Sequence, residues 1–152
     1  MNSRPKFTPE QIAALQTAYK QAIYEVYNSG QTITLSIDQE HPQLNKLMQQ
    51  YQVASWAIVT AVNPYSQPLP ELENRQRNQQ LQTYLQRLNL SILPAVGKDC
   101  HGDWTPEPSF IILGIDRQNA IAVGQKFAQN AIVYGAINQP ATLVWIGLDN
   151  GR

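Results

Sequence analysis

Hydrophobic residues recur along the chain at two spacings, and the changes between them predict alternating helices and strands. From Ile12 to Val26 the spacing is that of a helix, which the sequence predicts over about residues 8–28. Thr8 is a good N-cap with Pro9 behind it, and the Asn28–Gly30 stretch would end the run. The chain is therefore expected to begin with a long amphipathic helix.

The next segments predict two strands joined by a short helix. Residues 32–37 alternate strictly between polar and apolar side chains, as in a half-buried strand. Pro42 is suited to open a short helix, and Trp56–Val62 is a nearly continuous apolar run, typical of a strand buried on both faces. The run ends at a turn signal, Asn63–Ser66.

The second half of the chain repeats this alternation. A helix is predicted over 70–89, a strand over 90–96, a polar loop over 97–108, a strand over 110–115, a helix capped by Asp116, and strands over 131–136 and 142–146.

The order of elements from residue 54 to 137 is strand, helix, strand, strand, helix, strand. This order is typical of the split βαβ, or ferredoxin-like, arrangement. We expect an α+β protein with such a core over 54–146, a mixed or antiparallel sheet, an N-terminal helix and extra edge strands. A doubly wound parallel sheet is the alternative, but two direct strand-to-strand connections argue against it. Without repeats or linkers, residues 1–152 are expected to form a single domain.

Composition narrows the classes of function. Only 14% of residues are charged, against roughly 25% in ordinary domains, and the net charge is zero. Such a chain lacks the field that would hold nucleic acid or an anionic membrane, so neither partner is expected. The one cysteine, Cys100, has no partner for a disulfide or a zinc set, and no apolar leader stands at Met1–Phe7. We expect a soluble cytoplasmic protein without a metal or cofactor.

Polar side chains stand at several positions where the apolar pattern would place core. In the long helix, the stripe through Leu81 and Leu85 continues backwards onto Asn74 and Arg77. A buried guanidinium needs an acid, carbonyl groups or an anionic ligand. Polar residues also lead into two of the later strands.

Topology would bring these positions to one edge of the domain. In a ferredoxin-like sheet, the 56–62 strand lies between the strands that begin near 110 and 131, so its end lies beside their starts. The candidate ligand-binding residues at this edge are Asn63, Ser66, Glu73, Asn74, Arg77, Glu107, Ser109, Gln129 and Asn130.

Two interpretations of this cluster remain open. Arg77 near a helix N-terminus suits an anion such as phosphate or carboxylate, with Glu107 orienting Arg77 or accepting from the ligand. In the structural alternative, Arg77 and Glu107 form a buried ion pair, Asn63 belongs to a turn, and Gln129 caps a helix-to-strand connection.

The same residues carry a resemblance to a known family. The strings Ala57–Pro64, Glu107–Ser109 and Phe127–Ile132, together with Asn74 and Arg77, are similar to the bacterial "domain of unknown function 3293" family over roughly residues 10–146. Within these strings, Val62 stands where the family usually has an aromatic residue, and Ala128 stands where glycine is common. The resemblance implies the same residues as the pattern does and supplies no mechanism.

Three functions follow as hypotheses. The first is a binding or regulatory module whose edge pocket holds a small anionic or amide-bearing ligand. The second is a protein-interaction module that uses a neutral, glutamine-rich helix surface. The third is an enzyme in which Glu107 serves as acid or base, with Arg77 and Asn130 stabilising charge.

Overall fold

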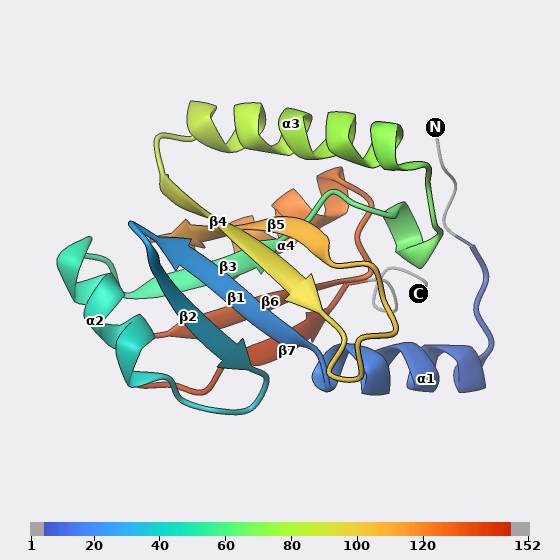
Figure 1. The fold of residues 1–152 in the computed structure, drawn as a ribbon, viewed down its shortest axis with the longest axis horizontal. Helices are drawn as coiled ribbons and strands as arrows, with labels where there is room; N and C mark the ends of the chain where they lie inside the picture. Colours follow the sequence, from blue (N-terminus) through green and yellow to red (C-terminus); the bar gives the residue numbers. More distant parts are fainter. Residues whose placement is uncertain (1–4, 147–152) are drawn as a thin grey trace.

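One seven-stranded sheet organises the fold in the computed structural model, which describes residues 5–146. The strand order is β2-β1-β4-β5-β3-β6-β7, every neighbouring pair is antiparallel, and the sheet curls into a half-barrel (Figure 1). The strands are β1 (Ile23–Asn28), β2 (Gln31–Ser36), β3 (Ser55–Val59), β4 (Ser91–Lys98), β5 (Glu107–Leu113), β6 (Ala131–Ala136) and β7 (Thr142–Trp145). The α+β class and the antiparallel sheet are thus confirmed, and the parallel alternative is wrong.

Four α-helices and a 3₁₀ turn complete the described part of the chain. They are α1 (Pro9–Lys20), α2 (Pro42–Gln50), η1 (Pro64–Ser66), α3 (Glu71–Arg87) and α4 (Arg117–Lys126). The predicted caps are present: Thr8 and Gln11 form a capping box on α1, and the Asp116 side chain accepts from the Asn119 amide.

The N-terminal helix is shorter than the sequence predicts. It ends at Lys20, and Ile23–Asn28 is not helical but a strand between β2 and β4. Ser29 and Gly30 both have positive φ, 51° and 81°, as tight hairpin turns require. The apolar spacing of Ile23 and Val26 fits a helix turn, but pairing with two neighbouring strands decides the conformation.

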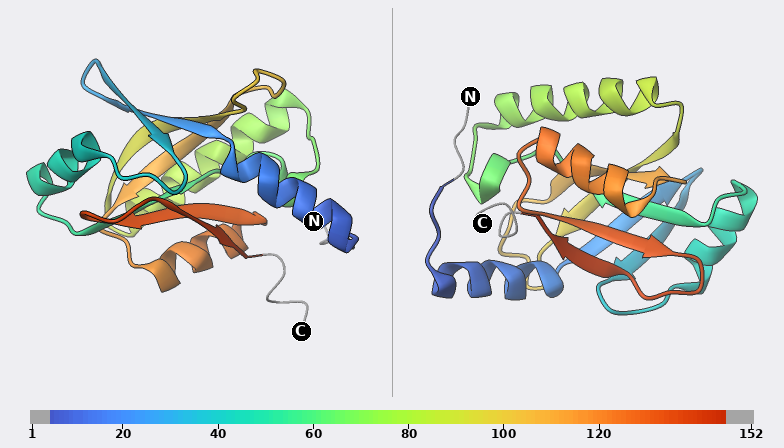
Figure 2. Two further views of the ribbon diagram at one scale, coloured as in Figure 1. Left: turned by 90° about the horizontal axis from the view of Figure 1, so that it is seen from below. Right: turned by 180° about the vertical axis from the view of Figure 1, so that it is seen from behind.

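β3 supplies side chains to a core on each face of the sheet. Trp56 and Ile58 pack on the inner, concave face with α2, whereas Ala57 and Val59 pack beneath α3 and α4. Figure 2 shows α3 and α4 covering the same face. The predicted burial of this strand on both sides is confirmed, although β3 ends at Val59 rather than Val62.

The helix α1 is attached differently from the other three. None of its residues is fully buried. It lies at the end of the sheet, beside β7 and the β4–β5 loop (Figure 1). The Tyr19 ring makes its aromatic contacts there, with Trp145 at 6.1 Å and Trp104 at 6.0 Å between ring centroids. α1 therefore borders the mouth of the curled sheet.

Candidate functional site

A row of three residues across neighbouring strands forms the base of the site. Tyr24 of β1 pairs with Gly97 of β4, and Gly97 pairs with Glu107 of β5. Residues opposite one another in a sheet point to the same face, here the concave one. A Cβ atom on Gly97 would lie 3.3 Å from Cε1 of Tyr24, so the glycine leaves room between the phenol and the carboxylate.

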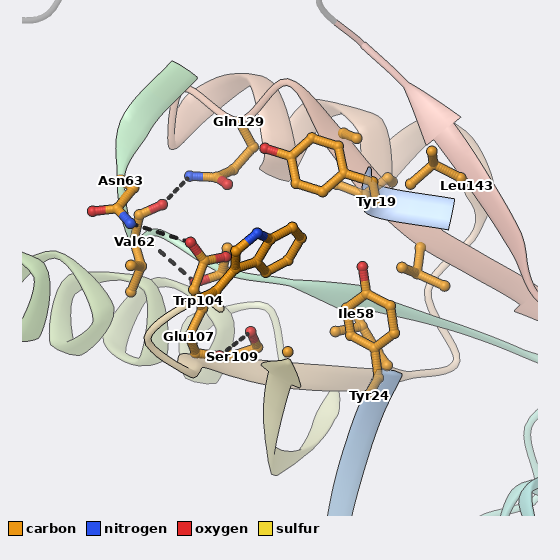
Figure 3. Close-up of a pocket in the computed structure, with 15 residues that line it drawn as sticks. Tyr19, Tyr24, Ile58, Val62, Asn63, Trp104, Glu107, Ser109, Gln129 and Leu143 are labelled. Atoms are coloured by element: carbon orange, nitrogen blue, oxygen red, sulfur yellow. Dashed lines mark hydrogen bonds between the residues drawn. The ribbon is translucent and has the colours of Figure 1, made fainter. Parts of the chain in front are cut away.

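This gap is part of a cavity of about 40 Å³ inside the curl. Tyr19 from α1 and Trp104 from the β4–β5 loop close its sides, with their rings edge to face at 73°. Figure 3 shows the Tyr24 hydroxyl pointing into the cavity and the Glu107 carboxylate beside the Trp104 indole. The cavity therefore combines an acid with three aromatic rings.

The Glu107 carboxylate is held by one amide. Asn63 Nδ2 donates to Glu107 Oε2 at 3.2 Å and is the single side-chain donor to this carboxylate within residues 5–146. Burial raises the pKa of Glu107, and the Asn63 bond offsets only part of that rise. Burial also raises the pKa values of Tyr19 and Tyr24. The cavity thus favours the protonated, neutral forms of its titratable groups.

Replacing Glu107 by glutamine should change how stability depends on pH. The pKa of Glu107 is higher in the folded protein than in the unfolded chain, so the folded state binds the proton more tightly. This stabilisation is complete below the unfolded-state pKa and is lost as the pH rises through the folded-state pKa. In Glu107→Gln the loss is absent, so its stability relative to wild type should increase from acidic to neutral pH.

Urea unfolding between about pH 4 and pH 8 measures this difference, because that range brackets an elevated carboxyl pKa. Glu73→Gln, the same charge change on an exposed side chain of α3, is the control. Parallel pH profiles for wild type and Glu107→Gln would contradict the prediction.

Asn63 and Asn74 bind one another in a closed network. Asn74 Oδ1 accepts from the Asn63 backbone N–H at 2.8 Å, and Asn74 Nδ2 donates to Asn63 Oδ1 at 2.7 Å. The Leu69 backbone N–H also donates to Asn63 Oδ1, at 3.0 Å. These bonds hold Asn63 in the left-handed conformation and aim its Nδ2 at Glu107.

Arg77 binds backbone carbonyl groups. Its Nε donates to Ala61 O and its Nη2 to Phe127 O, both at 2.6 Å, which joins α3 to the ends of β3 and α4. The ion pairs found within the described residues are Arg75–Glu71 and Lys98–Glu25, so Arg77 and Glu107 are not paired. The guanidinium has the carbonyl partners that its burial requires.

The remaining candidates fall into separate groups. Gln129 is buried and donates to Val62 O, while Asn130 Nδ2 donates to Ser66 Oγ at 3.0 Å, and Ser66 also bonds the Tyr19 hydroxyl. Ser109 is buried below Glu107 and donates to its backbone carbonyl. The one candidate that lies outside the cluster is Glu73, which is exposed on α3.

Four of the nine non-glycine residues with positive φ in the described part of the chain lie at this edge. Asn63, Tyr65, Ser66 and Ala128 all have positive φ, between 51° and 61°, although none is glycine. The Tyr65 N–H donates to Ala128 O at 2.6 Å, which ties the two strained segments together. Residues held in this region cost about 1–3 kcal/mol each and are typical of ligand sites and switches.

Eleven of the fifteen residues that line the cavity were not among the sequence candidates, and four of these lie around Glu107: Tyr19, Tyr24, Gly97 and Trp104. The sequence pattern predicted a helix at Tyr24. In the structure residues 23–28 form a strand, and Tyr24 lies two residues from Val26, so both side chains point to the concave face. Gly97 and Trp104 fell in or beside a polar loop, and no local pattern distinguishes them.

The arrangement of the described side chains and helices also bears on metals and membranes. Within residues 5–146, no group of three or more His, Cys, Asp or Glu side chains is arranged to hold a metal ion. No helix in that range is long and apolar enough to cross a membrane.

Comparison with known proteins gives one match. Neither a curated protein nor a solved structure matches the chain. The matched family segment contains the candidates from Asn63 to Asn130 and is shorter than the 10–146 span suggested by the motifs. The resemblance is confirmed: residues 59–132 match the model of the family described as "Protein of unknown function (DUF3293)".

Proposed function

We propose that this domain binds a small ligand whose head group enters the cavity between Tyr24, Trp104 and Glu107. The observation that carries the proposal is the Glu107 carboxylate, which is half-buried beside aromatic rings and has one amide donor. A carboxylate is least costly to bury when hydrogen-bond donors or a positive charge surround it. The head group is therefore an N–H donor, an ammonium or an amide.

Among these head groups, the aromatic rings of the cavity favour an ammonium. Tyr and Trp faces attract cations through their quadrupoles, most strongly when water is excluded. An ammonium in this cavity contacts Tyr19, Tyr24 and Trp104 and returns Glu107 to its charged form. The anionic ligand considered from the sequence is less well supported, because Arg77 spends two donors on carbonyl groups.

The size of the cavity limits what enters it. A buried water molecule needs a cavity of roughly 10–15 Å³, so this cavity of about 40 Å³ has room for about three water-sized groups. A methylammonium-sized head fits such a space, and the body of any larger ligand lies outside it.

Methylammonium chloride is the direct test. Titration followed by NMR should shift the Trp104 indole N–H, with sodium chloride at equal ionic strength as the control. Glu107→Gln should weaken binding at least tenfold, about 1.4 kcal/mol, since the charged partner is lost. If methylammonium leaves Trp104 unchanged, or binds Glu107→Gln as well as wild type, the proposal is wrong.

An enzyme is the second candidate function. Glu107 faces a cavity, and burial raises its pKa, which favours a general acid over an ordinary exposed carboxylate. Arg77, which the sequence suggested as a charge-stabilising partner, binds carbonyl groups instead. A ligand that is released chemically altered by wild type and unaltered by Glu107→Gln would favour this candidate.

A protein-interaction surface is the third. The glutamines of α3 named in this hypothesis are exposed and uncharged, so a partner could cover them without desolvating ions. They are Gln76, Gln79, Gln80, Gln82 and Gln86.

The ferredoxin-like core also stays a prediction. The elements β3, α3, β4, β5, α4 and β6 follow one another in the order that this arrangement needs. β3 lies between β5 and β6, the neighbours on which the argument for the site depends.

A further inference from the structure

A groove lies behind the wall that Glu107 shares with the cavity. It has a volume of about 690 Å³ and runs between the first half of α3 and the loop before β5. Val62, Asn63 and Glu107 line both the groove and the cavity. Glu107 therefore borders both spaces.

The groove is apolar and neutral in its lining. Prolines and a leucine supply apolar walls, and Asn78, Gln79 and Gln82 of α3 supply amides. Besides Glu107, its charged residues are Glu71 and Arg75, which pair with one another at 3.3 Å on the exposed rim. Amide side chains both donate and accept, as peptide groups do.

One polar atom of this lining has no partner. Asn78 Oδ1 is buried and accepts no hydrogen bond from any residue between 5 and 146. An unpaired buried acceptor is destabilising, and native proteins keep few of them. Asn78 itself lines the groove, so a rotation of its side-chain amide would bring Oδ1 to an N–H group of a ligand there.

We propose that the cavity and the groove together bind a short peptide-like chain by its free amino end. The inference rests on the proposed function: the terminal ammonium is the head group at Glu107, and the amide body extends along α3. Charge complementarity sets this polarity, because Glu107 is linked through Asn63 to Asn74 near the start of α3, and the other charged residues of the groove pair with one another. The volume falls within the roughly 300–1,000 Å³ of ordinary ligand pockets.

The length of the groove sets the length of the chain. From Asn74 to Gln82 a helix rises about 12 Å, at roughly 1.5 Å per residue. An extended chain covers about 3.3 Å per residue, so three or four residues match this span.

Three probes separate the head group from the body in calorimetric titrations. They are L-alaninamide (head alone), trialanine amide (head and body) and N-acetyl-trialanine amide (body alone). Trialanine amide should bind at least tenfold more tightly than L-alaninamide, and acetylation should reduce its affinity at least tenfold.

Two variants on α3 test the groove itself. Asn78→Ala should weaken trialanine amide severalfold and leave L-alaninamide unchanged, and it should fold because it removes an unpaired acceptor. Gln80→Ala, an exposed amide on the same helix that is not part of the groove, is the matched control.

The outcomes distinguish the two proposals. If both amines bind equally and Asn78→Ala changes neither, the groove is not used and the proposal here is wrong, while the head-group site stands. If the acetylated peptide binds as well as the free one, the polarity is wrong. If neither these amines nor methylammonium bind, both proposals fail.

Discussion

Arg77→Met should lower the free energy of unfolding by about 3 kcal/mol. The substitution removes the hydrogen bond to Ala61 O, a carbonyl of a fully buried residue with no other partner in the described contacts. It also removes a charge-assisted bond to Phe127 O, although Gln129 Nε2 still donates to that carbonyl. An orphaned buried acceptor costs about 1–3 kcal/mol, and a bond to a charged group contributes about 1.5–3 kcal/mol.

Chemical denaturation of Arg77→Met and Arg75→Met provides the comparison. Arg75 lies two residues away on the same helix, and its pair with Glu71 is exposed. Exposed ion pairs contribute at most about 1 kcal/mol, so Arg75→Met should be nearly neutral. Equal effects of the two substitutions would show that Arg77 does not hold the carbonyl groups together, and would return it to the candidates for ligand binding.

Gly135→Ala should be at least as destabilising, by about 3 kcal/mol. A Cβ at position 135 would lie 2.4 Å from Cζ2 and 2.5 Å from Cε2 of Trp56, its partner across the β3–β6 pair. The indole is 1% exposed, so it has no open space into which to move. Overpacking a well-packed core costs about 1–3 kcal/mol and occasionally more.

A double-mutant cycle identifies the cause. Trp56→Leu is destabilising by itself, but it removes the atoms with which the new methyl group collides. Gly135→Ala should therefore be much less harmful in the Trp56→Leu background than in wild type. Additive effects would rule out the steric explanation.

The sequence indicated the edge of the domain on which the candidate site lies. The unbroken apolar run from Trp56 identified a central strand, and its two expected neighbours are the ones observed, β5 and β6. Because antiparallel neighbours meet start to end, Asn63, Glu107 and Gln129 were expected together, and all three line the cavity. The order of elements along the chain and the antiparallel direction of the strands were sufficient to predict that these residues meet.

The sequence did not indicate which of these side chains use their hydrogen-bonding groups within the protein and so have none left for a ligand. Arg77 stood in a polar stripe, and its carbonyl partners lie 16 and 50 residues away in the chain. No local pattern encodes such contacts. The cavity likewise depends on Tyr24 lying opposite Gly97, a consequence of strand register. The register of β1 against β4 cannot be predicted until the boundary between α1 and β1 is known. The helix-like spacing of Ile23 and Val26 led to a wrong prediction of that boundary.

The attachment of α1 by half-buried side chains offers one route by which the cavity can be reached. No residue of this helix is fully buried and none belongs to either hydrophobic core, so its detachment leaves both cores intact. Tyr19, which closes the cavity, would leave with it. One route to Glu107 is then a local opening of α1, Pro9–Lys20, and global unfolding is not needed. Along this route, the association rate of a ligand would follow the frequency of that opening.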